Sequence, residues 1–231
     1  MEYREGLYVG YRYFESVDAP VLFPFGYGLS YTSYAYRGLA GDKKEISEDD
    51  TLKATVTVDN TGESDGKAVV QLYVIHDGKT VYMLKVQLRA FDKVKIAAKS
   101  SATVTFILDK RAFAFYDVNE KDWVVESGDY EIAVGGNVRE LICRTTVKVN
   151  GRAEAKADAS DKGWYYSPDV KKPVSDEDFA SLFKNGKTTH VTHECVKGSF
   201  TADDSFEDMS HTSGLARFLL NFAKPMIRMS M

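Results

Sequence analysis

The feature that most constrains the fold is a series of short segments between about residues 51 and 149 in which apolar and polar side chains alternate. The first runs from Leu52 to Val58 and ends at Asn60-Thr61-Gly62, a sequence typical of a turn. Similar segments follow at residues 68–74, 86–91, 102–108, 123–125, 130–134 and 141–149. About seven short strands separated by turns are typical of an antiparallel β-sandwich, which we predict for residues 48–150.

The residues before this region have a different pattern. Residues 6–14 alternate β-branched and aromatic side chains and predict a strand, whereas residues 20–31 are aromatic, irregular and rich in glycine. A lone strand leaves backbone groups unpaired unless a sheet receives it. We therefore expect residues 1–38 to be the terminal segment of an incomplete domain.

Residues 151–231 are predicted to form a linker and a helical extension. Residues 151–162 have no apolar periodicity and read as a linker or solvated loop. Ser175 is a candidate N-cap with Asp178 three residues later. It precedes a short helix with Phe179, Leu182 and Phe183 on one face, which should end at Asn185-Gly186. Apolar residues at helical spacing from Leu215 to Met226 predict a second helix, which Pro225 should kink or end.

Charge and hydropathy exclude several kinds of partner. The 231 residues include 30 basic and 34 acidic side chains, so the basic excess that attracts nucleic acid is missing. No apolar run approaches the roughly 18–20 residues of a transmembrane helix, which makes a membrane an unlikely partner. Cys143 and Cys195 can form at most one disulfide, and such low cysteine usage favours a reducing, cytoplasmic compartment.

Three local patterns in the sequence are candidate sites. Residues 190–195 combine two histidines, a glutamate and a cysteine, but their spacing is not that of a zinc site, and a solvated loop is favoured. Trp123 is expected in the sandwich core, with an exposed sugar platform as the alternative. The charged turn at residues 109–111 needs no function.

Two motifs carry a resemblance to a known family. EGLYVGYRYF (residues 5–14) and LFPFGYGLSYT (residues 22–32) resemble the segment that ends the α/β sandwich domain of glycoside hydrolase family 3, the β-glucosidase and β-xylosidase family. The resemblance implies that residues 1–38 come from that α/β sandwich domain. Residues 200–231 loosely resemble a tail of some bacterial members, which implies a bacterial origin.

The sandwich region resembles the fibronectin type III-like domain that follows in many members of this family. The resemblance is carried by VTVDNTG (56–62), DGKAVVQLYV (65–74), LRAFDKV (88–94), FAFYD (113–117) and WVVESGDY (123–130). The family usually has glycine at the position of Ala90, and the loop at residues 76–81 is short. The implied fold is mainly β: an immunoglobulin-like sandwich flanked by the α/β segment and the helical tail.

The resemblance implies chemistry that this chain lacks. The family uses an aspartate nucleophile in a Ser-Asp-Trp motif of its barrel domain, with a separate general acid/base. Ser64-Asp65, Ser160-Asp161 and Ser175-Asp176 are not followed by tryptophan. Glu5 is the only acid in the first motif, but the family's acid/base lies upstream, so Glu5 is interpreted as structural.

We therefore predict no catalytic, cofactor-binding or metal-ligating residue here, and leave substrate-binding residues unassigned. The N-terminal aromatic side chains are expected to form a core or an interface rather than to stack on a sugar; they are Tyr8, Tyr11, Tyr13, Phe14, Phe23 and Phe25.

The expected function is that of a noncatalytic C-terminal portion of a family 3 β-glycosidase. Its partners would be the enzyme's catalytic domains and, through them, a β-linked glycoside. By itself the chain is expected to be inactive. Two other classes stay open: a free-standing carbohydrate-binding or adhesion module, and a module that binds a protein through the tail helix. Sugar specificity and oligomeric state are left unassigned.

Overall fold

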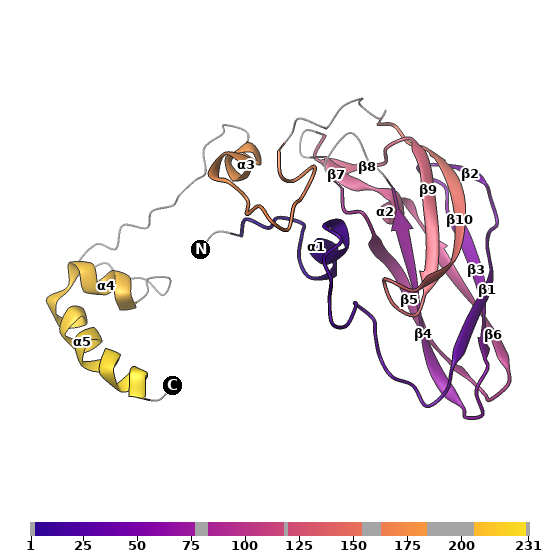
Figure 1. The fold of residues 1–231 in the computed structure, drawn as a ribbon. Helices are drawn as coiled ribbons and strands as arrows, with labels where there is room; N and C mark the ends of the chain where they lie inside the picture. Colours follow the sequence, from indigo (N-terminus) through magenta and orange to yellow (C-terminus); the bar gives the residue numbers. More distant parts are fainter. Residues whose placement is uncertain (1–2, 77–82, 118–119, 154–162, 184–205, 230–231) are drawn as a thin grey trace. The chain divides into compact units, whose positions relative to one another are not determined.

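A computed structural model describes residues 3–76, 83–117, 120–153, 163–183 and 206–229. The chain divides into two compact units, Met1–Leu182 and Phe183–Met231, and each is described by itself. The first unit contains the sandwich (Figure 1).

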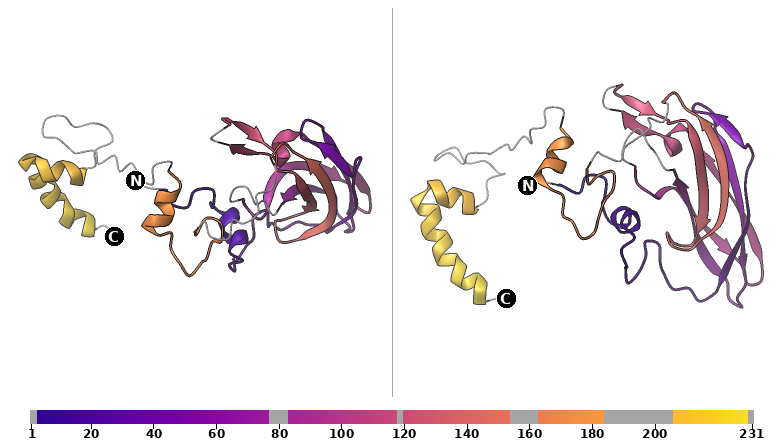
Figure 2. Two further views of the ribbon diagram at one scale, coloured as in Figure 1. Left: turned by 90° about the horizontal axis from the view of Figure 1, so that it is seen from above. Right: turned by 45° about the horizontal axis from the view of Figure 1, so that its top comes forward.

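Two sheets face each other in the first unit (Figure 2). The smaller has the strand order β1 (Tyr34–Gly41), β3 (Leu52–Asn60), β6 (Ser101–Leu108). The larger has the order β2 (Glu45–Ser47), β10 (Leu141–Asn150), β9 (Gly128–Gly135), β4 (Gly66–Ile75), β5 (Gln87–Ile96). Pairing is antiparallel except between β2 and β10, which confirms a mainly β, antiparallel sandwich.

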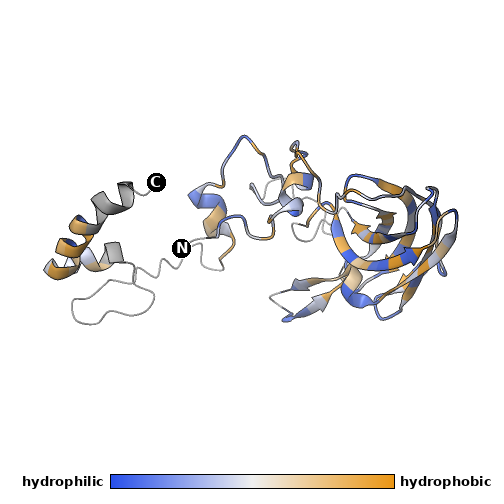
Figure 3. Ribbon diagram, turned by 90° about the horizontal axis from the view of Figure 1, so that it is seen from below, coloured by the Kyte–Doolittle hydropathy of each residue, from blue (hydrophilic) through white to orange (hydrophobic). Residues whose placement is uncertain are grey.

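The apolar alternation of the strands places their inner faces in one core. Along β3, Leu52, Ala54, Val56 and Val58 are all buried, and polar residues alternate with them. The same alternation appears as bands along the strands in Figure 3. Tyr130 of β9 lies in the same core as β3. At the edge of the larger sheet, β5 instead carries the charged residues Asp92, Lys93 and Lys95.

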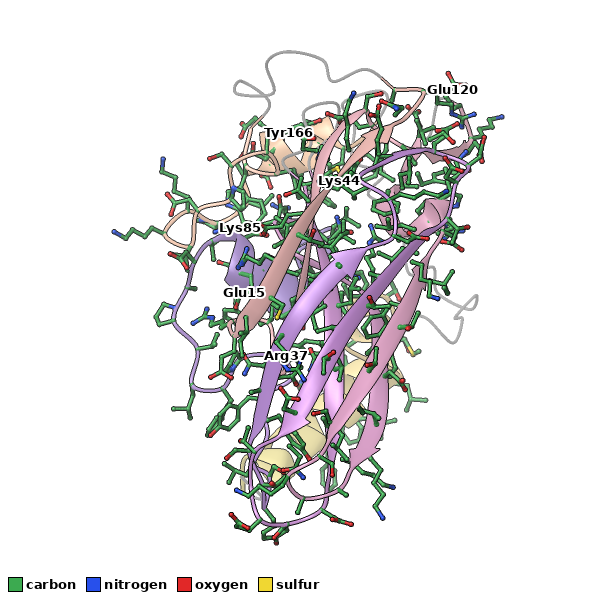
Figure 4. All side chains as sticks on the ribbon, turned by 90° about the vertical axis from the view of Figure 1, so that its right-hand side faces the viewer. Glu15, Arg37, Lys44, Lys85, Glu120 and Tyr166 are labelled. Atoms are coloured by element: carbon green, nitrogen blue, oxygen red, sulfur yellow. The ribbon has the colours of Figure 1, made fainter. Side chains whose placement is uncertain are left out.

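The sandwich begins before its predicted start at residue 48. β1 pairs with β3, with Tyr34 opposite Asn60, and β2 pairs with β10. The boundary placed at residue 38 therefore falls inside a strand. A bulge interrupts β1 where Gly38 has φ of 67°. Arg37, labelled in Figure 4, donates two hydrogen bonds to Asp59 of β3.

A hairpin lies outside the two main sheets, and only its second strand, near residues 123–125, was predicted. β7 (Phe115–Asp117) pairs with β8 (Asp122–Val124), and the short helix α2 (Lys110–Phe113) precedes them. Asp109 caps α2 by accepting the backbone N–H of Arg111. The charged turn at residues 109–111 is thus the start of a helix.

The strand predicted at residues 6–14 is wrong. This segment forms turns followed by helix α1 (Tyr11–Ser16). Gly10, immediately before the helix, has φ of 59°, a left-handed conformation that breaks an extended chain. The segment's aromatic side chains pack on separate partners instead of sharing one sheet face.

The two helical predictions are confirmed in position. α3 (Asp176–Ser181), in the first unit, begins where Ser175 Oγ accepts the backbone N–H of Asp178 at 3.0 Å. In the second unit, α4 (Phe206–Thr212) precedes α5 (Gly214–Met229), which continues as helix through Pro225. None of the helices described has the length and apolar character that spanning a bilayer requires.

Candidate functional site

The N-terminal segment meets the chain that follows the sandwich in a small aromatic core. Buried Tyr8 donates its hydroxyl to the carbonyl of Tyr165 at 2.5 Å, and the hydroxyl of Tyr165 donates to the carbonyl of Arg4 at 2.5 Å. Trp164 contacts Tyr8 edge to face and lies parallel to Tyr13. Sequence reasoning did not single out Trp164 or Tyr165, although the aromatic run 164–166 just after a polar linker is a usable signal.

Tyr11 connects α1 to the sandwich. Its hydroxyl accepts the backbone N–H of Leu88 in β5 at 3.0 Å. Its ring stacks on Phe25 at 4.7 Å between centroids and meets the buried Tyr73 of β4 edge to face. Tyr8 and Tyr11 therefore make the intramolecular contacts expected of core or interface residues.

Glu5 lies at the rim of a shallow hollow of about 500 Å³ that Tyr8, Tyr13 and Trp164 also line. Its backbone carbonyl accepts the N–H of Tyr8, which is a turn contact. A retaining glycosidase needs two carboxyl groups about 5–5.5 Å apart. Glu5 is the only acidic residue among the described residues that line this hollow, so the arrangement does not fit that chemistry.

The loop before β1 exposes an unusual amount of apolar surface. Leu22 and Leu29 are 88% and 92% exposed, and Phe23 and Tyr31 are also exposed. Single exposed apolar residues are common on protein surfaces, but several within ten positions indicate an interaction surface. We call residues 22–31 the apolar loop.

Trp123 is held at the edge of the sandwich core. Its ring is partly buried against the core, and the guanidinium carbon of Arg111 lies 3.5 Å from the ring centroid. Tyr116 contacts Trp123 edge to face across the β7–β8 hairpin. Because Arg111 covers one ring face, the geometry agrees with the expected core role better than with a sugar platform.

The remaining candidates have structural contacts. Asp65 accepts the backbone N–H of Ala98, and Asp176 pairs with Arg4. The side chain of His76, a further histidine of the chain, is 8% exposed and stacks on Tyr130. Residues 160–161 and 190–195 lie outside the described residues. Within the part of the chain that the structure describes, no group of three or more His, Cys, Asp or Glu side chains is placed to hold a metal.

The sandwich belongs to a known class of domain. Residues 68–138 match the family model of the fibronectin type III-like domain. The match runs from the start of β4 to just after β9, which includes the hairpin and most of the larger sheet.

The comparisons with whole proteins extend beyond that domain. The chain is 42% identical over 156 residues to thermostable β-glucosidase B of Acetivibrio thermocellus, covering 68% of this chain and 21% of the relative. It is 40% identical over 151 residues to an exo-α-(1→6)-L-arabinopyranosidase of Bifidobacterium breve, and the match covers 65% of this chain and 20% of that relative. The crystal structure of a family 3 β-glucosidase from Bifidobacterium adolescentis matches with TM-score 0.61 and 37% identity, over 71% of this chain and 24% of that one.

The chain therefore matches the C-terminal part of a glycoside hydrolase family 3 β-glucosidase-like protein. It spans about a fifth of the length of the curated relatives.

Proposed function

We propose that this chain is the noncatalytic C-terminal portion of a family 3 β-glycosidase and that it braces the enzyme's catalytic domains. The observation that carries the proposal is the extent of the match, about a fifth of each curated relative. The described residues supply no pair of carboxylates arranged for glycoside hydrolysis in the hollow beside Glu5. The partners would be the catalytic domains and, through them, a β-linked glycoside.

The apolar loop is the surface proposed to contact those domains. Burying one large apolar side chain is worth roughly 1.5–3 kcal/mol, so several such residues together supply substantial contact free energy. The loop also holds to the sandwich through Phe25, whose carbonyl accepts the backbone N–H of Val138. A contact made by the loop would thereby be transmitted to the larger sheet.

Activity of the purified chain tests the first part of the proposal. We expect no cleavage of aryl β-glucosides or β-xylosides above background. Turnover that survives repurification and disappears in Glu5→Gln would overturn the noncatalytic assignment.

A chimera tests the bracing role. The matching part of the Acetivibrio thermocellus enzyme is replaced by this chain, and the thermal midpoint and β-glucosidase activity are measured. We expect Leu22→Ser with Leu29→Ser to lower the midpoint of the chimera. Ile107→Ser is the matched control, since this side chain is 63% exposed on β6, away from the loop. Equal midpoints for the double variant and the control would refute bracing through the apolar loop.

A further inference from the structure

A second cavity lies between the N-terminal segment, β5, the β7–β8 hairpin and the α3 region. It has a volume of about 560 Å³, within the range of small-molecule sites. Its wall is largely apolar and aromatic, with Leu84, Trp123 and Tyr166 among its members. Two guanidinium groups, those of Arg12 and Arg89, also line it. We call it the arginine pocket.

Arg89 lies in this pocket with part of its hydrogen-bonding capacity unused. Its Nη2 donates to Gln87 Oε1 at 2.6 Å. Its Nε is buried and has no hydrogen-bond partner among the described residues. A buried donor without an acceptor is destabilising because it has lost its hydrogen bonds to water, and the cost is greater when the group is charged. The pKa of Arg89 is lowered because burial removes water from the guanidinium and because Arg12 adds a second positive charge nearby.

The position of Arg12 beside Arg89 is fixed by the fold. The preceding residue, Tyr11, binds the backbone of Leu88, which itself precedes Arg89 in β5. Arg12 therefore comes directly after Tyr11 in the sequence and Arg89 directly after Leu88, and Tyr11 and Leu88 are hydrogen-bonded to each other. Both guanidinium groups line the pocket, so two like charges share it, an arrangement that is unfavourable without a counter-charge.

The described residues do not supply that counter-charge. No carboxylate among them lies within 4.0 Å of the guanidinium nitrogens of Arg12 or Arg89. Among the described residues of the lining, Asp117 is the one carboxylate, and its Oδ1 accepts the backbone N–H of Glu120 at 3.3 Å. Arg111, another nearby cation, lies over Trp123. Among the described residues, the two guanidinium groups thus form no ion pair, and the pocket combines their positive charge with an apolar wall.

We propose that the arginine pocket binds a small organic carboxylate, whose anionic group accepts hydrogen bonds from Arg12 and Arg89 and whose apolar body lies against the aromatic wall. The planar guanidinium fork matches the two oxygens of a carboxylate. A monoanion fits this wall better than a phosphate dianion, because removing a second charge from water into apolar surroundings costs more. The inference does not depend on the proposed bracing role.

The probe is benzoate, with benzamide as its neutral counterpart of the same shape. Binding is followed in two-dimensional ¹H–¹⁵N spectra of the full chain through the indole N–H of Trp123, distinguished from that of Trp164 by the variant Trp164→Phe. We expect a saturable shift with benzoate and none with benzamide. Arg89→Gln should weaken benzoate binding at least about tenfold, which corresponds to about 1.4 kcal/mol. Arg37→Gln, an exposed arginine paired with Asp59, should bind benzoate like the wild type.

Arg12→Gln provides a second test if Arg89→Gln does not fold, and it too should weaken binding. Equal shifts with benzoate and benzamide would show an apolar cavity without an anion site and would overturn the proposal. Unchanged affinity in the folded arginine variants would overturn it as well, because the carboxylate would then bind elsewhere. The absence of any saturable shift at millimolar benzoate would have the same consequence.

Discussion

The hydroxyl of Tyr11 in α1 accepts the backbone N–H of Leu88 in β5 at 3.0 Å. This single bond joins the N-terminal segment to the edge strand of the larger sheet. The Tyr11 ring adds contacts with Phe25 and Tyr73. Removing this hydrogen bond therefore tests how strongly the N-terminal segment is attached to the sandwich.

Replacing Tyr11 by phenylalanine keeps the ring contacts and removes the acceptor of the Leu88 N–H. Leaving this partly buried donor unpaired should lower the free energy of unfolding by about 1–2 kcal/mol, measured by urea denaturation. The control is Tyr27→Phe, whose hydroxyl has no hydrogen-bond partner among the described residues and whose ring is 48% exposed. If both variants unfold at the same urea concentration, the bond contributes nothing measurable.

The sandwich should fold by itself, and its N-terminal boundary should lie before β1. We expect a fragment of residues 34–153 to unfold cooperatively at a higher urea concentration than residues 48–150, because the shorter one loses the strands β1 and β2. Limited proteolysis of the whole chain should trim both ends first. Early cleavage within β3 or β6, with the ends still intact, would contradict this boundary.

Lowering the pH should loosen α3 through Asp178. The backbone N–H of Trp164 and the groups of Ser175 hydrogen-bond to this carboxylate and lower its pKa. A lowered folded-state pKa stabilises the fold fully above the unfolded value of about 3.9, and the contribution is lost as pH falls through the folded value. The backbone amide signal of Trp164, followed by NMR from about pH 6 downward, should therefore change below about pH 4.

Two variants separate Asp178 from its neighbours. Asp178→Asn should remove the acid transition at Trp164, because no carboxylate is left there to titrate. Glu177→Gln, which changes the adjacent acid, should retain it. A transition that persists in Asp178→Asn would assign the pH response to another group.

The tail helix α5 should dock on a protein surface. Its apolar side chains Leu215, Phe218 and Phe222 are exposed within the second unit, with Phe218 at 67%. An isolated helix of this length is only marginally stable in water, so a docked helix should show slow amide exchange at residues 215–226. Phe218→Asp with Phe222→Asp should make this exchange fast. Rapid exchange in the wild type that slows only with anionic vesicles would favour a membrane instead.

The sandwich was largely predictable because its inner-facing residues alternate with polar ones along most strands. β3 shows why. Every second residue from Leu52 to Val58 is buried, so the apolar residues recur in the sequence with the two-residue period at which strand side chains point to the same face. β1 was missed because its aromatic start at Tyr34 continues the aromatic run of the apolar loop. Only its pairing with β3 distinguishes it from the segment before it.

The N-terminal segment failed as a strand for a related reason. Alternation at residues 6–14 reflects aromatic contacts with different partners, such as Tyr8 with Trp164 and Tyr11 with Tyr73. Those partners are far away in the sequence, so no local pattern indicates them. The arginine pocket is likewise assembled from four separate segments, which no spacing rule could bring together.

The charged edge of the larger sheet limits how the sandwich can associate. Within the described part of the chain, β5 has only β4 as a hydrogen-bonded neighbour. It carries Asp92, Lys93 and Lys95, and charged side chains on an edge strand disfavour pairing with a foreign strand. The opposite edge strand, β2, has three residues and offers too short a template. Strand addition to the larger sheet is therefore disfavoured as a route to self-association, and a protein that joins this sheet must recognise its side chains.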